Sequence, residues 1–209
     1  MTAPSHDAAS WIADWQPEDP ALLAARQRAA EVGVATVDPA TGAVLRLLAS
    51  GVGARTAVEL GTGAGVSTLW LLRGLRPEGV LTTVDSDGEH QRLAKASLSD
   101  AEVPNGRVRL ISGRALEVLP RLSERAYDLV FCDAARSENA DYLTAALTLL
   151  RPGGLVVFNG ALGRVPEPSA RDAETVAMRG LAVLVRDEPR LTASMIPVGG
   201  GLLAATLNS

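Results

Sequence analysis

The chain has 209 residues, of which 47% are hydrophobic and 21% charged, and 20 basic against 24 acidic side chains give a formal net charge of −4. These values are ordinary for a globular domain and exclude disorder as the main state. They also argue against a protein that binds duplex nucleic acid, because that affinity needs clustered positive charge. The length fits one domain with a small appendage.

The chain contains a single cysteine, Cys132, which excludes an internal disulfide framework and a Cys-cluster zinc site. The first ten residues lack a positive region followed by an apolar one, so no secretory signal is expected. No apolar stretch approaches the roughly 20 residues needed to span a bilayer. The sequence therefore predicts a soluble, cytoplasmic protein without a membrane partner.

Residues 1–50 are expected to form a helical segment that caps the rest of the chain or mediates dimerisation. Residues 21–31 are rich in helix formers, and a second helix is expected from Pro39 to Gly51, with Asp38 or Thr36 as its cap. Residues 51–209 would then form the main domain.

Trp11 and Trp15 are four residues apart, so a short helix would place both on one face. They could pack onto the domain, pack onto a partner subunit, or cover a substrate. Packing of either kind is the favoured interpretation, and a homodimer is predicted.

From residue 55 onward, short apolar runs alternate with amphipathic stretches. Five runs, rich in Val, Leu and Thr, predict buried strands: TAVELG, VLTTVD, VRLISG, YDLVFCD and GLVVFN. Helix-like segments lie between them: VSTLWLLRGL, EHQRLAKASLSDA, ALEVLPRLS (broken near Pro120) and NADYLTAALTLLR. This alternation indicates right-handed crossovers and a parallel sheet covered on both faces.

The C-terminal part predicts a helix over residues 170–187 and then the strands LTASMIPV and GLLAATL, separated by three glycines. Glycines between two strands indicate an antiparallel hairpin. The predicted fold class is therefore α/β: a Rossmann-like, seven-stranded, mostly parallel sheet with helices on both faces and a C-terminal antiparallel β-hairpin.

The first predicted strand ends in the glycine-rich turn Glu59-Leu60-Gly61-Thr62-Gly63-Ala64-Gly65. Ligands of open parallel sheets bind at the carboxyl ends of the strands, where glycines allow close backbone approach. The dinucleotide fingerprint requires glycine at position 66, which is Val66 here. Glu59 would repel a pyrophosphate but suits a ligand that bears an ammonium or sulfonium group.

The second predicted strand ends in Asp85, 24 positions after Gly61. A carboxylate there can accept hydrogen bonds from both hydroxyls of a ribose. The alternative is that Asp85 only caps the following helix. The glycine loop upstream favours ribose binding.

The pattern ExGxGxG, followed by an acidic residue at the end of the second strand, resembles the class I S-adenosylmethionine-dependent methyltransferases. The blocks AVELGTGAGVSTLWLL, LTTVD, VRLISGRALEVLPRL, YDLVFCDA and LLRPGGLVVFN are similar to the catechol and caffeoyl-CoA type O-methyltransferases. The resemblance implies an S-adenosylmethionine cofactor and methyl transfer to the hydroxyl of a small molecule, with a phenol as the expected acceptor.

The resemblance also implies roles for individual residues. Those expected to bind the cofactor are Glu59, Gly61, Thr62, Gly63 and Ser67 for the methionine portion, Asp85 and Ser86 for the ribose, Gly113, Arg114 and Ala115 for the adenine, and Asp133 under the transferred methyl group.

The chain departs from this family at the expected metal site. Many members bind a divalent cation through an Asp after the fourth strand and an Asp-Asn pair after the fifth, and here the pair is Phe158-Asn159. One carboxylate and one amide offset little of the cost of dehydrating Mg²⁺ or Ca²⁺. No metal ligand is therefore assigned, and a divalent metal is not expected.

The catalytic candidates are Asp133 and Arg136. Asp133 could remove the acceptor's proton if burial raises its pKa, or it could only orient the cofactor. Arg136 stands where many members have a lysine and stays protonated, so it could stabilise a phenolate or form a surface ion pair. Neither His6 nor His90 is expected to be catalytic, and Cys132 is expected in the core.

Two other functions remain open at this point. The changes at Phe158 and Arg136 would also fit a protein that binds the cofactor but has lost catalysis. A nucleotide-dependent oxidoreductase shares a similar sheet, although Glu59 and Val66 argue against it.

Overall fold

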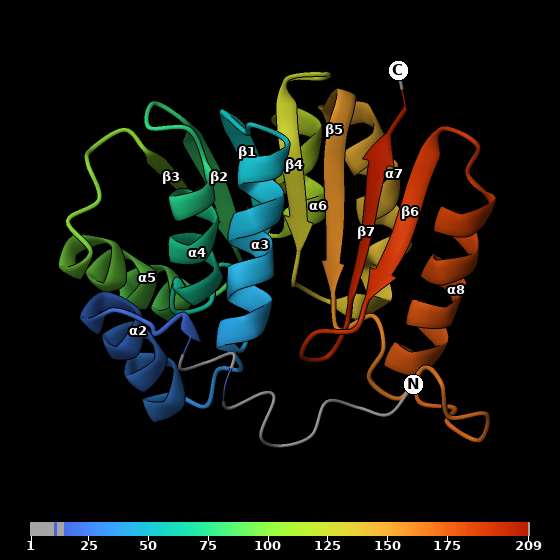
Figure 1. Ribbon diagram of the computed structural model, residues 1–209, viewed down its shortest axis with the longest axis horizontal. Helices are drawn as coiled ribbons and strands as arrows, with labels where there is room; N and C mark the ends of the chain where they lie inside the picture. The colour runs from blue at the N-terminus through green and yellow to red at the C-terminus, as the bar shows by residue number, and fades with distance from the viewer. Residues whose placement is uncertain (1–10, 12–14, 209) are drawn as a thin grey trace.

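The computed structural model describes residues 11 and 15–208, and its centre is a seven-stranded sheet in the order β3-β2-β1-β4-β5-β7-β6 (Figure 1). The strands β1 to β5 are parallel, and β7 pairs antiparallel with both β5 and β6. The predicted fold class, including the terminal antiparallel pair, is confirmed. The strands are β1 (Thr56–Leu60), β2 (Val80–Asp85), β3 (Val108–Ser112), β4 (Tyr127–Cys132), β5 (Leu150–Asn159), β6 (Leu191–Ile196) and β7 (Leu202–Leu207).

Helices cover both faces of this sheet, and each face has its own apolar core. Side chains of α2, α3, α4 and α5 pack on one face, and those of α6, α7 and α8 pack on the other. The helices are α2 (Pro20–Glu31), α3 (Pro39–Gly51), α4 (Val66–Gly74), α5 (Gly88–Asp100), α6 (Ala115–Val118), α7 (Asn139–Leu149) and α8 (Ala173–Asp187), with 3-10 turns η1 (Leu119–Arg121) and η2 (Arg136–Glu138).

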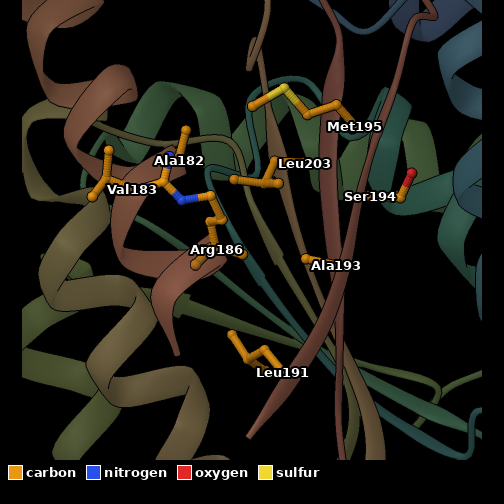
Figure 2. Close-up of a pocket in the computed structure, with 9 residues that line it drawn as sticks. Ala182, Val183, Arg186, Leu191, Ala193, Ser194, Met195 and Leu203 are labelled. Atoms are coloured by element: carbon orange, nitrogen blue, oxygen red, sulfur yellow. The ribbon is translucent and has the colours of Figure 1, made fainter. Parts of the chain in front are cut away.

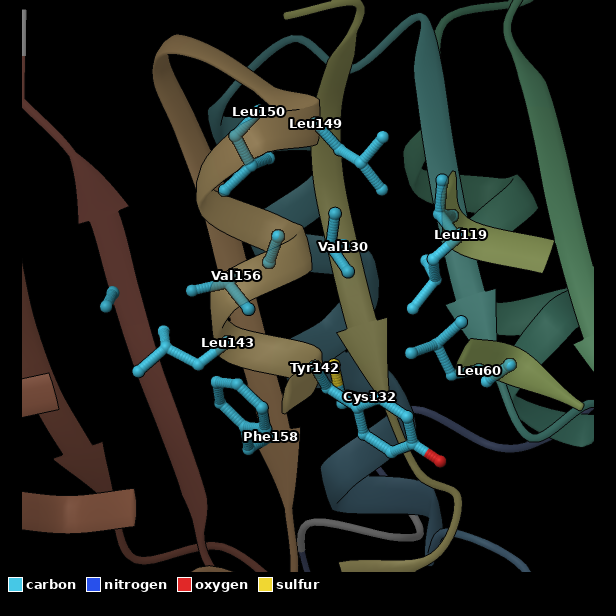
Figure 3. Close-up of a cluster of buried hydrophobic side chains, with 14 of the residues drawn as sticks. Leu60, Leu119, Val130, Cys132, Tyr142, Leu143, Leu149, Leu150, Val156 and Phe158 are labelled. Atoms are coloured by element: carbon cyan, nitrogen blue, oxygen red, sulfur yellow. The ribbon is translucent and has the colours of Figure 1, made fainter. Parts of the chain in front are cut away.

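The two cores follow from the alternation of side chains along the strands. In β4, Leu129 and Phe131 point into the core under α3 and α4, whereas Val130 and Cys132 point into the core under α7. Figure 3 shows Cys132 packed there beside Tyr142 and Phe158. The expectation that Cys132 is a core residue is confirmed.

Two predicted elements differ from the observed ones. The segment VRLISG was expected to be buried, but β3 is half-exposed because it forms one edge of the sheet. The last residues of NADYLTAALTLLR were expected to be helical, but α7 ends at Leu149 and β5 already begins at Leu150, which pairs with Tyr127. A register shift between Tyr127 and Leu129 accommodates this early start.

Carboxylate side chains stabilise the N-terminal ends of α2 and α3. Asp38 caps α3 by accepting a hydrogen bond from the backbone N–H of Thr41 at 3.0 Å, so Asp38 rather than Thr36 is the cap. Buried Glu18 accepts hydrogen bonds from Arg26 and from the indole N–H of Trp70, which ties the start of α2 to α4.

Trp11 and Trp15 are 65% and 70% exposed, so neither is covered by the described part of this chain. Packing of the two tryptophans onto the described part of the domain is therefore not observed. The other two expected roles, packing onto a partner subunit and covering a substrate, stay open. In the described residues, no helix has the length and apolar character needed to cross a membrane.

Candidate active site

The loop after β1 lies against the end of β4, and only glycine permits this contact. Gly61 has a φ of +92°, and a Cβ at this position would lie 2.3 Å from the carbonyl oxygen of Asp133. The backbone N–H of Asp133 donates to the carbonyl of Leu60, and that of Gly61 donates to the carbonyl of Val84. These bonds bring the carboxyl ends of β1, β2 and β4 together.

Two adjoining cavities open at this edge of the sheet, and they share the walls Gly61, Asp85, His90 and Asp133. The smaller cavity has a volume of about 110 Å³ and the larger one about 360 Å³. The smaller is also lined by Val34, Ala35, Thr36, Val37, Thr62, Gly63, Ala64, Val66 and Ser67, and the larger by Val84, Ser86, Gly113, Arg114, Ala115, Ala134, Ala135, Glu138 and Tyr142.

Most of the residues predicted from the sequence therefore line these two cavities. Glu59 and Arg136 are the exceptions, because neither belongs to a cavity wall. The glycine loop and Ser67 line the smaller cavity, and Ser86 and residues 113–115 line the larger one. Asp85 and Asp133 stand at the junction.

Glu59 is completely buried in β1, just before the glycine loop that lines the smaller cavity. One of its carboxylate oxygens accepts hydrogen bonds from the hydroxyls of Thr68 at 2.6 Å and Thr83 at 2.7 Å, whereas Oε1 has no partner among the described residues. Burial raises its pKa from 4.5 to about 7, against the opposing effect of the Ser67, Thr68 and Thr83 hydroxyls. An unpaired oxygen on a buried carboxylate is costly and calls for a donor or a cation.

Asp85 is held rigidly at the end of β2. One oxygen accepts from the backbone N–H of Gly63 at 2.9 Å and lies 3.1 Å from Nδ1 of His90, and the other accepts from the N–H of Asp87. The N-cap of α5 is Asp87, so the alternative that Asp85 serves as the helix cap is wrong. The side chain of Asp85 faces both cavities instead.

Asp133 follows β4 directly and is held by Asn159, whose side-chain nitrogen donates to Oδ1 at 2.9 Å. Burial raises the pKa of Asp133 from 3.8 to about 6, and the hydrogen bond from Asn159 and the positive charge of Arg136 limit the rise. A carboxylate with this pKa can exchange a proton near neutral pH.

The residues around Asp133 do not fit a divalent metal. Phe158 lies in the core (Figure 3) and offers no oxygen. The Asn159 amide nitrogen donates to Asp133. Across the described ranges, 11 and 15–208, no group of three or more His, Cys, Asp or Glu side chains could hold an ion. Hard cations need several oxygen ligands, which this donor set lacks.

Arg136 lies outside both cavities. Its guanidinium forms a 2.7 Å ion pair with Glu174 on α8, and both side chains are substantially exposed. It also covers Gly160, where a Cβ would lie 2.6 Å from a guanidinium nitrogen. Of the two expected roles, this geometry matches the ion pair, and the charge of Arg136 reaches the site only through its effect on Asp133.

Sequence reasoning missed three titratable residues of the cavity walls: His90, Glu138 and Tyr142. His90 contacts Asp85, and its position in the first turn after the Asp87 cap was the available signal. Glu138 and Tyr142 are bonded to each other, and their spacing of four residues on one helical face was a weak signal.

A separate cavity of about 410 Å³ lies between α8 and β6, away from these carboxylates (Figure 2). Its walls are mainly apolar, as the labelled Val183, Leu203 and Met195 show, and Arg186 carries the single charge among the lining residues. No group there could donate or accept a proton near neutral pH. Most of the residues that the sequence predicts for a binding site line the paired cavities instead.

Comparison with known proteins identifies the family to which this chain is similar. A model of a family described as O-methyltransferase matches residues 19–207. A relative from Mycolicibacterium vanbaalenii with an O-methyltransferase name is 53% identical over 190 residues, which cover 90% of this chain and 84% of the relative.

Solved structures extend the similarity. The O-methyltransferase TomG from Streptomyces achromogenes, in complex with S-adenosylmethionine, is 30% identical with a TM-score of 0.88, covering 97% of this chain and 96% of its own. An O-methyltransferase from Bacillus cereus, in complex with S-adenosylhomocysteine, is 29% identical with a TM-score of 0.88 and covers 97% of both chains.

The burial of Glu59 leads to a prediction about the pH dependence of stability. The unfolded chain loses the protons of Glu59 and Asp133 near their ordinary pKa values of 4.5 and 3.8, whereas the folded protein keeps them until about pH 7 and pH 6, so its free energy of unfolding should fall as the pH rises through this window. For Glu59 the full fall corresponds to about 3 kcal/mol. Glu59→Gln should remove that part and become more stable than the wild type at pH 8.

Urea unfolding without cofactor, at several pH values, measures this difference. Glu124→Gln, which makes the same change at an exposed position, should leave the pH dependence unchanged. Equal pH dependence in the wild type and Glu59→Gln would contradict the assigned cost of the Glu59 charge.

Proposed function

We infer the chemistry of this chain from its family: it belongs to the O-methyltransferases. We propose that its methyl donor is S-adenosylmethionine, that its acceptor is the hydroxyl group of a small phenolic molecule, and that it works without a divalent metal. The observation that carries the proposal is the unpaired, buried oxygen of Glu59, which lies just before the glycine loop that lines the smaller cavity together with Asp133.

The cavities fit this donor part by part. The ligand is positively charged at its sulfonium and ammonium groups, and Glu59 and Asp133 place negative charge under and beside the smaller cavity. We assign Glu59, Gly61, Thr62, Gly63 and Ser67 to the methionine portion, Asp85 and Ser86 to the ribose, and Gly113, Arg114 and Ala115 to the adenine.

When bound, the cofactor supplies a methyl group that its sulfonium already activates. The protein therefore has to position the acceptor and remove one proton. In the proposed step the acceptor O–H gives its proton to the free oxygen of Asp133 while the acceptor oxygen bonds to the methyl carbon. The cofactor would supply the leaving group, because the electron pair of its carbon–sulfur bond would stay on the sulfur as a neutral thioether.

The pKa of Asp133 supports a phenolic acceptor. A phenol loses its proton near pH 10, as tyrosine does, and a carboxylate with a pKa of about 6 is a much better match for it than for an aliphatic alcohol. Asn159 holds one oxygen of Asp133, which leaves the other for the acceptor.

The donor set around Asp133 supports metal independence, because Phe158 lies in the core and Arg136 is paired with Glu174. The presence of Phe158 and Arg136 at these positions would also be consistent with a protein that binds the cofactor but does not catalyse methyl transfer. That second candidate predicts binding of S-adenosylhomocysteine but no turnover with any phenol.

The proposed base makes a prediction about pH. In excess chelator, kcat/KM for S-adenosylmethionine should rise with pH through about 6 as Asp133 of the free protein loses its proton, and added magnesium should not change it. Asp133→Asn should lower kcat by about 100-fold or more and remove this rise, as expected for loss of a general base.

The measurement is transfer of a labelled methyl group to a panel of phenols between pH 5 and 9. Binding of S-adenosylhomocysteine to Asp133→Asn controls for an intact cofactor site. A rise near pH 6 that persists in Asp133→Asn would show that this residue only orients the cofactor. A rate that requires magnesium would overturn metal independence.

We also propose that residues 1–50 form a helical cap on a methyltransferase domain of residues 51–209 and contribute to a homodimer. The exposed Trp11 and Trp15 support this proposal, because in the described part of the chain both large apolar side chains are left open to solvent.

Light scattering should accordingly give a mass close to twice 21.7 kDa for the wild type. The double variant Trp11→Ser and Trp15→Ser should shift the equilibrium toward the monomer, because it removes apolar contact area. A wild-type protein that is monomeric at micromolar concentration would contradict the proposed dimer.

A further inference from the structure

The larger cavity contains a third carboxylate that the proposed reaction does not use. Of its acidic wall residues, Asp85 and Asp133 are assigned to the ribose and the acceptor, and Glu138 is left. Glu138 lies at the end of η2 and shares no hydrogen-bond partner with Asp85 in the described structure. The Glu138 carboxylate can therefore contact a ligand in the cavity independently of Asp85.

Glu138 is fixed in place by two neighbours. Its Oε2 accepts from the hydroxyl of Tyr142 at 2.6 Å, and its Oε1 accepts from the guanidinium of Arg114 at 3.1 Å. Tyr142 is 2% exposed, so this donor is anchored in the core. Each carboxylate oxygen has a second acceptor position, so both remain able to accept a hydrogen bond from a ligand.

The surroundings of Glu138 suit a flat aromatic base. Ala115, Ala134 and Ala135 line the same cavity, and their methyl groups offer apolar surface without hydrogen-bonding groups. An adenosine whose ribose binds Asp85 would place its base within these walls. The 6-amino group of adenine then needs an acceptor, and the guanidinium of Arg114 can only donate.

We propose that Glu138 is the specificity-determining residue for the base, accepting a hydrogen bond from the 6-amino group of adenine and rejecting a base with an oxygen at that position. This inference rests on the proposed cofactor. Tyr142 and Arg114 act as positioning residues that hold the carboxylate against the cavity.

The test compares two ligands that differ at that one position: S-adenosylhomocysteine and S-inosylhomocysteine, which has a 6-oxo group. By calorimetric titration, the wild type should bind the adenine compound at least about tenfold more tightly. The 6-amino group donates a hydrogen bond to the charged carboxylate of Glu138, whereas the 6-oxo group is repelled by it. Glu138→Gln should reduce the ratio to about threefold or less, because an amide can donate to the oxo group.

Glu117→Gln is the matched control, because it removes the same charge from an exposed position on α6 outside the cavity lining, and it should keep the wild-type ratio. Tyr142→Phe should give an intermediate ratio. A wild type that binds both ligands equally, or a Glu138→Gln variant that keeps the full preference, would overturn the assignment of Glu138. Failure of the wild type to bind either ligand would instead overturn the proposed cofactor, and the inference with it.

Discussion

The close contact between the loop after β1 and the end of β4 is the constraint on which the site depends. Any side chain at position 61 would collide with the carbonyl oxygen of Asp133, so a glycine with positive φ stands there. Because the strands are parallel, this contact brings Glu59, at the end of one strand, toward Asp133, which follows the other. The result is two buried carboxylates that both resist ionisation.

Such an arrangement is unfavourable in the empty protein and favourable once a cation is bound. Burial raises both pKa values, and the charge of Asp133 raises that of Glu59 further. A ligand with ammonium and sulfonium groups supplies the missing positive charge, so stability given up in the apo protein is recovered on binding. One pair of carboxylates can thus serve two purposes: selection of a cationic methyl donor and, at Asp133, removal of a proton.

The sequence predicted the sheet, and most of its predicted site residues line the cavities, because glycines and acidic residues follow apolar runs at strand ends, and parallel strands bring those ends together. The sequence was a poorer guide where burial or element boundaries depend on contacts between distant segments. The edge position of β3 leaves its apolar run half-exposed, and β5 begins at Leu150, within the run that was expected to be helical. Glu138 was missed because its role depends on contacts with Arg114 and Tyr142, which come from different elements.

Proton release on cofactor binding tests the central claim, that the site is a buried anionic receptor for a cationic ligand, most directly. Calorimetric titration of S-adenosylhomocysteine, in chelator and in buffers of different ionisation enthalpy, should show release of protons near pH 7 because the ligand's ammonium group lowers the pKa of Glu59. Glu59→Gln should bind more weakly and lose most of the release at that pH. Binding without proton release, or no binding in either protein, would contradict the account.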